Sequence, residues 1–371
     1  MRPQAVDTMN MDIDNIRKEF FKKSISVGYH NIRYAWSEIA ATIAEQDWKR
    51  QAIEAVPIEE GKPSADTVRN RLDLKAGWDD FFHEALYECF KVVVRCYSRL
   101  RWSILIDETY DGYYGKYLKE LLETPEGEDI MAHLLGHKPE TKKGSTGSFG
   151  FLVVMTRSKK ILLPIAVFPI RKKMRYEPLL EPLLKRMRQH LPHAPILADR
   201  GFGQHVAFFR MLERVGGPYC IRFKNHGKSI KKKVENGVRQ FSYWYGKGDA
   251  KVLLTIRVGK DRKGNLYLFA TTFTEKDRKW AWLRQLYKGR WGIENMFKFC
   301  DRIHLPTSSI KPRMRLFCQM LAHLLFALWQ LQRLLTPRIR LALQRFVHWC
   351  VKALRTIAAA LQGEPFPATP G

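Results

Sequence analysis

The most informative spacing in the chain lies in residues 287–301, which read YKGRWGIENMFKFCD. Tyr287, Arg290 and Glu294 are separated by three and then four residues, so a helix would place them on one face. Such a face combines a carboxylate that can bind a metal ion with a guanidinium and a phenol that can bind a phosphate. Lys298 continues the same stripe. The alternative interpretation is an exposed helix face with ordinary ion pairs.

Two glycines weaken the helix prediction for this segment. Gly289 and Gly292 each cost about 1 kcal/mol in a helix relative to alanine. The helix is therefore expected to begin near Gly292, with Tyr287 and Arg290 on the turn that leads into it.

Two further carboxylates follow short apolar runs that are typical of buried strands. The run SILID ends in Asp107, and the run APILA is followed at once by Asp199. A carboxylate at the end of a buried strand is costly unless it is paired or bound to a metal ion. Mg²⁺ prefers carboxylate, phosphate and water oxygens, and two such ions about 4 Å apart promote phosphodiester displacement. Because Asp107, Asp199 and Glu294 are far apart in the sequence, only folding can bring them together.

Each of these strand-end acids has a competing interpretation. A strand points Asp107 and its neighbour Glu108 to opposite faces, so Glu108 is the alternative metal ligand. Asp111, a little further on, is expected in a turn. Asp199 has an alternative role as the cap of the helix that follows it.

The elements that must position these acids alternate between strand and helix. We expect a strand hairpin at 149–155 and 161–168, helices at 177–189 and 205–215, and a strand at 219–223. A β-rich insertion follows, with tight turns at Asn236-Gly237 and Lys263-Gly264. A helix at 275–287 then leads into the Glu294 segment. Residues 316–335 are expected to form a buried core helix rather than a membrane span.

The overall composition favours a nucleic-acid partner. Lys and Arg total 64 against 37 Asp and Glu, which gives a net charge of +27 and a need for a polyanion. The six cysteines form no Cys-x-x-Cys pair, so they indicate buried thiols in a reducing, cytoplasmic compartment. The first residues lack the apolar core of a signal peptide, and no membrane partner is expected.

The segments LIDETY, LADRGFG and YKGRWGIENMFKFCD resemble those of the DDE transposases of bacterial insertion sequences. The closest subgroup has a Tyr-x2-Arg-x3-Glu signature and a β-rich insertion before the last acid, and the resemblance covers roughly residues 100–310. It implies an α/β fold with an RNase-H-like core that uses Mg²⁺ or Mn²⁺. The implied catalytic and metal-binding triad is Asp107, Asp199 and Glu294.

The same resemblance implies DNA contacts and a reaction. Tyr287 and Arg290 would bind phosphates near the cleavage site. The family has a Lys at the position of Asp301 in this chain, and Lys298, one turn earlier, is the substitute for that charge. The implied partners are double-stranded DNA at the element's terminal repeats, target DNA, and a second protomer in the DNA complex. Water activated by metal would nick the element end, and the freed 3′-hydroxyl would attack the target.

The expected organisation has four regions. They are a helical N-terminal DNA-binding domain (1–100), the catalytic core (101–223 and 273–310), the insertion (224–272) and a helical C-terminal region (311–371). Arg69 and Arg71 lie in a segment with the outline of a helix-turn-helix reader, although any small basic helical bundle looks similar. As a bacterial DNA-acting protein, the chain is expected at the nucleoid.

Further DNA-contact candidates each have a structural alternative. Trp291 would stack on an extruded base or pack in the core. Arg200 would bind a phosphate or pair with an acid. Lys231, Lys232 and Lys233 would follow a DNA backbone or form a solvated turn. Phe202, between two glycines, would be a base wedge or a core side chain.

Two other functions fit the same residues. One is a nuclease of the same fold that cuts DNA without strand transfer. The other is a non-catalytic DNA-binding protein derived from a transposase, although all three acids are present.

Overall fold

The computed structural model of the chain describes residues 78–114, 125–136, 144–159, 161–224, 227–260, 263–304 and 309–335. Arg69 and Arg71, with most of the predicted N-terminal domain, lie outside these residues. The chain after residue 335 also lies outside them. The statements below concern the described part.

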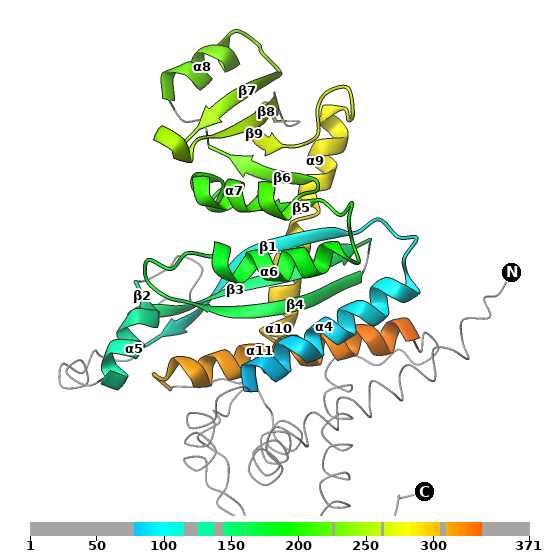
Figure 1. The fold of residues 1–371 in the computed structure, drawn as a ribbon. Helices are drawn as coiled ribbons and strands as arrows, with labels where there is room; N and C mark the ends of the chain where they lie inside the picture. Colours follow the sequence, from blue (N-terminus) through cyan, green and yellow to red (C-terminus); the bar gives the residue numbers. More distant parts are fainter. Residues whose placement is uncertain are drawn as a thin grey trace, which may run out of the picture.

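A mixed sheet of nine strands runs through the centre of the described structure (Figure 1). Its strands are β1 (Ser103–Tyr113), β2 (Leu134–Leu135), β3 (Gly147–Ser158), β4 (Ile161–Ile170), β5 (Ile196–Ala198), β6 (Tyr219–Phe223), β7 (Gln240–Tyr245), β8 (Val252–Lys260) and β9 (Leu266–Thr271). The order is β2-β3-β1-β5-β6-β9-β8-β7, and β4 pairs with β3. Strands β1, β3 and β4 are antiparallel neighbours, whereas β5 and β6 run parallel to β1.

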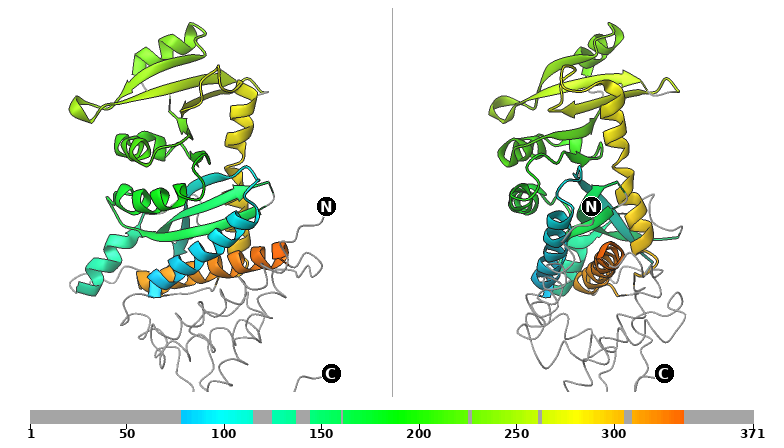
Figure 2. Two further views of the ribbon diagram at one scale, coloured as in Figure 1. Left: turned by 45° about the vertical axis from the view of Figure 1, so that its right-hand side comes forward. Right: turned by 90° about the vertical axis from the view of Figure 1, so that its right-hand side faces the viewer.

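Helices cover both faces of this sheet (Figure 2). Helices α6 (Glu177–Arg188) and α7 (Val206–Val215) lie on one face, and α9 (Trp280–Lys288) and α10 (Trp291–Cys300) lie on the other. Helix α5 (Pro125–His133) precedes β2. These positions confirm the predicted hairpin, the two predicted helices and the strand at 219–223. The amphipathic spacing explains α7, whose Phe208, Met211, Leu212 and Val215 are buried while Arg210 and Glu213 are exposed.

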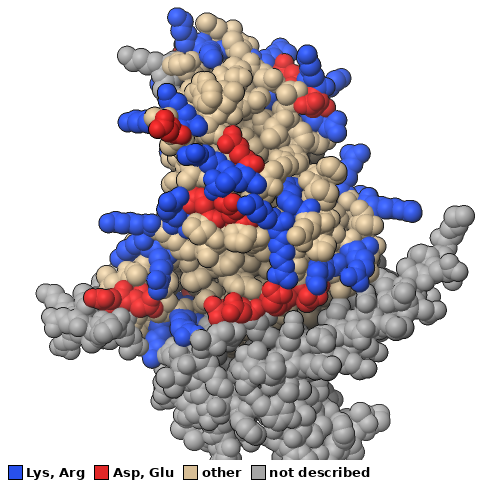
Figure 3. Space-filling model, viewed as in Figure 1, with Lys and Arg blue, Asp and Glu red and all other residues tan. Residues whose placement is uncertain are grey.

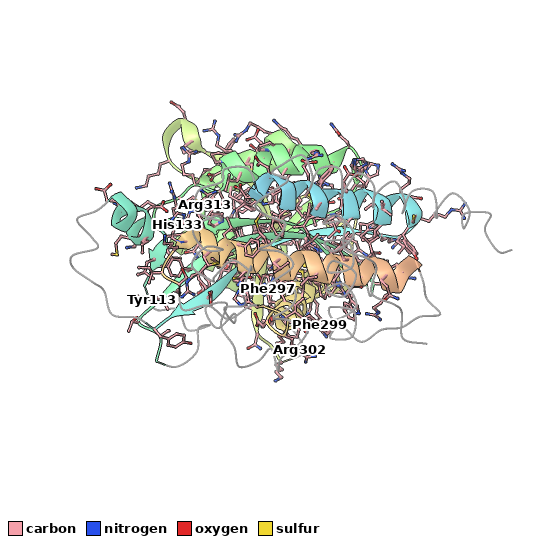
Figure 4. All side chains as sticks on the ribbon, turned by 90° about the horizontal axis from the view of Figure 1, so that it is seen from below. Tyr113, His133, Phe297, Phe299, Arg302 and Arg313 are labelled. Carbon is pink, nitrogen blue, oxygen red and sulfur yellow. The ribbon has the colours of Figure 1, made fainter. Side chains whose placement is uncertain are left out.

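Helices α4 (Trp78–Cys96) and α11 (Pro312–Leu335) pack against β4 and against each other. Helix α11 is long and apolar enough to cross a membrane, but 94% of that segment is buried inside the fold. Phe297 and Phe299 of α10 lie beside it (Figure 4), and Phe299 stacks with Phe326 and Trp329 of α11. The prediction of a buried core helix is therefore confirmed. The described cysteines are free thiols, and all except Cys96 are buried.

The insertion differs from its predicted form. Residues 227–235 form helix α8 (Gly227–Glu235) rather than a strand, so the hairpin predicted at Asn236-Gly237 is wrong. Ile230 is fully buried and Val234, four residues later, packs on the core, which is a helical period. Gly237, with φ of 70°, ends the helix instead of turning a hairpin. The hairpin around Lys263-Gly264 is confirmed as β8–β9.

The strands of the insertion also continue the central sheet. Strand β9 pairs with β6, and β8 and β7 follow it outward. The elements from β6 to β7 therefore belong to one hydrogen-bonded ladder. The division of the chain into the four predicted regions remains a prediction.

Candidate active site

Strand β1 carries Asp107 in its middle rather than at its end. The strand was expected to stop at Asp107, but it continues to Tyr113 because β3 pairs with every residue of it. The alternation of a strand sends Asp107 and Glu108 to opposite faces. Asp111 lies on this strand rather than in the predicted turn, and its carboxylate pairs with the buried Arg315 of α11.

Glu108 is held on the face opposite to Asp107. Tyr176, just before α6, donates a hydrogen bond of 2.8 Å to its Oε1, and Tyr110 donates to its Oε2. These bonds use both carboxylate oxygens. The alternative assignment of Glu108 as a metal ligand therefore has no geometric support.

Arg290 stands between two of the three predicted acids. Its Nη1 donates to Asp107 Oδ2, and its Nη2 donates to Glu294 Oε1 at 2.7 Å. The side chains of Arg290 and Asp107 are each 14% exposed, whereas Glu294 is 47% exposed. The remaining Arg290 donor, Nε, is buried without a hydrogen-bond partner. A guanidinium in this position balances charge but leaves one donor unsatisfied.

Asp199 lies beside this pair because strands β1 and β5 run parallel. Ala198 pairs with Ile106. Asp199, the first residue after β5, therefore lies next to Asp107 of β1. Asp199 Oδ1 accepts backbone N–H bonds from Gly201 at 2.7 Å and from Phe202 at 3.4 Å. These bonds hold the turn after β5, but Asp199 does not cap α7, whose N-cap residue, His205, has no side-chain cap hydrogen bond.

Burial is the main influence on the charge of Asp107. It raises the pKa of Asp107 to about 7, whereas Arg290 lowers it and the nearby carboxylates of Asp199 and Glu294 raise it further. Asp199 and Glu294 are therefore close enough to Asp107 to raise its pKa. A carboxyl with such a pKa suits a metal ion, which would replace the lost solvation.

The acids supply the right donor chemistry for a divalent cation, but they do not form a closed ligand set. Among the described residues, no group of three Asp, Glu, His or Cys side chains is arranged to hold a metal ion. Arg290 takes the place between Asp107 and Glu294. A metal ion therefore fits only when the Arg290 guanidinium moves.

Tyr287 belongs to α9, so the helical stripe begins one turn earlier than expected. Helix α9 ends at Lys288, and Gly289 and Arg290 join it to α10. Tyr287 packs against Phe269 with ring centroids 4.8 Å apart. Burial raises the pKa of its hydroxyl, which Arg290 opposes and Asp199 reinforces. The phenol is therefore a neutral hydrogen-bond donor beside the acids.

The remaining predicted DNA contacts fall in different places. Trp291 is 58% exposed at the start of α10, which rules out its core alternative. Arg200 and Lys298 are also exposed, whereas Phe202 is buried as a core side chain. The three predicted lysines are on α8, at the far end of the sheet from α10 (Figure 1). Of these, Lys231 and Lys232 are exposed, and Lys233 lies 4.7 Å from the centre of the Phe241 ring.

One cation near the site was missed by sequence reasoning. Ala198 pairs with Ile221, so Arg222 is the β6 residue next to Asp199. Its guanidinium lies 4.5 Å from the centre of the Tyr267 ring and lowers the pKa of the Tyr287 hydroxyl. The signal available in the sequence was the position of Arg222 at the carboxyl end of a predicted parallel strand.

Comparisons with known proteins identify the family of the chain and a similar fold. The family model described as "Transposase DDE domain" matches residues 136–329, which is more than half of the chain and includes Asp199 and Glu294. A solved structure, the cryo-EM synaptic complex of the piggyBac transposase with hairpin DNA, matches with a TM-score of 0.53. That match covers 91% of this chain and 73% of the other at 11% identity, so it shows likeness of fold. No match was found among curated proteins. Because this family model covers more than half of the sequence, the chain belongs to the DDE-domain transposase family.

Proposed function

We propose that this protein is a transposase that cuts DNA at the ends of an insertion element and joins the 3′-hydroxyl to target DNA. The observation that carries the proposal is the meeting of Asp107, Asp199 and Glu294 around Arg290 in a chain of this family. The mixed order of β4, β3, β1, β5 and β6 supports the RNase-H-like core implied by the sequence resemblance.

Asp107, Asp199 and Glu294 would hold Mg²⁺ or Mn²⁺. Bound ions supply Lewis-acid stabilisation of the attacking and leaving oxygens in phosphodiester transfer. Because Asp199 Oδ1 is engaged by backbone N–H groups, Oδ2 is the oxygen assigned to this task. The backbone bonds to Oδ1 fix the orientation of the carboxylate.

Arg290 changes partners in this proposal. Its guanidinium leaves the two acids and binds a phosphate oxygen, which gives the buried Nε a partner as well. The neutral hydroxyl of Tyr287 donates a hydrogen bond to the same phosphate. Tyr287 is on α9 and Arg290 immediately precedes α10, so the two helices would hold both groups in place to orient the scissile phosphate before the reaction.

Double-stranded DNA is the proposed partner. The net charge of +27 supports a polyanion, and the solved relative is described in a synaptic complex with hairpin DNA. A pair of protomers would hold two element ends. Exposed Trp291, next to Arg290, would stack on an unpaired base.

The test uses a plasmid that carries this gene with its natural flanking DNA, incubated with the purified protein and Mg²⁺ or Mn²⁺. We expect nicked and then joined products. Asp107→Asn should lower the nicking rate roughly a thousandfold or more, because the transition-state charge loses several kcal/mol of stabilisation. Glu108→Gln is the matched control on the opposite face, and it should keep activity.

Three outcomes distinguish the possible functions. Nicking without joined products would identify a nuclease of the same fold. DNA binding without metal-dependent nicking would indicate a non-catalytic relative. Equal activity of the Asp107→Asn variant and the unmodified protein would overturn the assignment of the site.

A further inference from the structure

Arg157, near the end of β3, lies under the junction of α9 and α10. A Cβ atom added at Gly289 would lie 2.3 Å from Arg157 Nη1, and one added at Gly292 would lie 2.7 Å from Arg157 Cδ. The two glycines that weaken the helix prediction therefore make room for this guanidinium. A side chain larger than hydrogen at either position would push Arg157 away.

The Arg157 side chain is half-buried and has no countercharge. Among the described residues, none forms a hydrogen bond or an ion pair with it. Other arginines in the same fold are paired, such as Arg186 with Glu84 and Arg315 with Asp111. A guanidinium that is partly removed from water without an acid is suited to an anion from outside the chain.

Arg157 is on the same face of the sheet as Asp107. Asp107 pairs with Val153 and Ser103 pairs with Arg157, so the two positions are an even number of residues apart along β1 and β3. At about 3.4 Å per residue, the offset of four residues is roughly 14 Å. Successive phosphates of one DNA strand are about 3.4 Å apart along the helix axis. The offset between Arg157 and Asp107 therefore equals about four nucleotides of a DNA strand.

Neighbouring residues extend the positive charge. Lys159 is exposed in the β3–β4 turn, and Arg101 is exposed on the segment to which Ser158 hydrogen-bonds. Figure 3 shows the opposite, α6–α7 face, where lysine and arginine side chains lie among acidic ones. Arg157, Lys159 and Arg101 together define the hairpin-end basic surface.

We propose that the hairpin-end basic surface binds the phosphate backbone of the substrate duplex, with Arg157 as its anchor. This inference rests on the proposed function, because it extends the DNA path beyond the scissile phosphate. The surface contacts phosphates only, so it holds DNA of any sequence.

The experiment measures binding of a short fluorescein-labelled duplex of arbitrary sequence by anisotropy, over a range of KCl concentrations and without divalent metal. The slope of log K against log[KCl] should shrink by about 0.9 in Arg157→Met, because one phosphate contact is lost. Arg157→Lys should restore most of the slope, since it keeps the charge. Arg210→Met is the matched control, because Arg210 is exposed on α7 on the opposite face.

An unchanged slope in Arg157→Met would overturn the proposal. Arg157 would then serve only as a cation near the carbonyl end of α9, and its loss would appear in thermal unfolding alone. Should Arg157→Met fail to fold, the exposed Lys159→Met decides, since it should also reduce the slope and would overturn the surface by leaving it unchanged. Absence of DNA cleavage would contradict the proposed function without altering these slopes.

Discussion

The two faces of the sheet differ in how their charged side chains are paired. On the α6–α7 face, acids are matched by local partners: Glu181 binds Lys185 and Arg214, and Glu84 binds Arg186 through two hydrogen bonds. On the α9–α10 face, Arg290 is shared between two acids and keeps a buried donor without a partner. Adjacent residues of β1 show the same division, because Glu108 is saturated by tyrosines while Asp107 is buried among other acids.

This contrast indicates which face of the sheet is suited to bind a ligand. Matched ion pairs on a solvated surface contribute little to folding stability, and their charges are already balanced without a ligand. Arginines without an acid and carboxyls with a raised pKa are costly in an isolated protein, and an added metal ion and phosphate remove both costs. The charged groups without matched partners therefore support the proposed active site on the α9–α10 face.

Among the variants that compare the two faces, the largest effect should come from Arg290→Gln, which removes the shared cation. Nicking should fall roughly a hundredfold, since one charged donor to the phosphate is lost. Binding of Mn²⁺ to the DNA-free protein should strengthen, because no guanidinium competes for Asp107 and Glu294. Electron paramagnetic resonance titration of Mn²⁺ measures this, and Arg214→Gln on the other face is the control. Weaker Mn²⁺ binding in Arg290→Gln would refute the exchange of partners.

A smaller effect concerns the helix that backs the site. His323 of α11 is fully buried, its Nδ1 contacts Gln319 O at 2.7 Å, and its Nε2 has no partner. Burial lowers the pKa of His323 to about 4, below its value of about 6.5 in the unfolded chain, so protonation favours unfolding. This contribution is complete above pH 6.5 and lost towards pH 4, by about 2 kcal/mol at pH 5.

The measurement for His323 is urea unfolding at pH 7.5 and pH 5. The unmodified protein should lose more stability between these values than His323→Leu, which cannot gain a proton. Equal losses in the two proteins would show that His323 does not titrate on unfolding.

The smallest effect should come from Glu181→Gln on the α6–α7 face. Its partners, Lys185 and Arg214, hold the pKa of Glu181 at about 2, but both partners are exposed to solvent. DNA nicking and its salt dependence should stay the same, and the melting temperature should barely change. A clear loss of nicking would break the distinction between the two faces.

Local patterns in the sequence predicted much of the core and two of the three acids in their settings. Asp199 directly follows β5 and Glu294 lies on a helix that Arg290 immediately precedes, because short apolar runs and helical spacing are local signals. The continuation of β1 past Asp107 depends on pairing with β3, which no local pattern in DETYDGY reveals. Helix α8 escaped prediction because Asn-Gly is also an effective helix stop.

The cations near the proposed site could not be predicted from the sequence, because their positions depend on the register between distant strands. Arg222 and Arg157 become meaningful only when β6 is aligned with β5 and β3 with β1. The role of Gly289 and Gly292 was also hidden, because the Arg157 side chain that they admit comes from a distant strand. Tertiary pairing therefore determines which cations surround the acids.

The continuous hydrogen-bonded sheet from β5 to β7 fixes the distance between these two strands. Four strand steps of about 4.8 Å separate β5 from β7, a distance of roughly 19 Å across the sheet. A duplex that touches the outermost strand while one of its phosphates rests at Asp199 must span that length, or about five to six base pairs at about 3.4 Å each. Because hydrogen bonds join each pair of neighbouring strands, the distance between a DNA contact at β7 and the proposed cleavage site at Asp199 would stay constant.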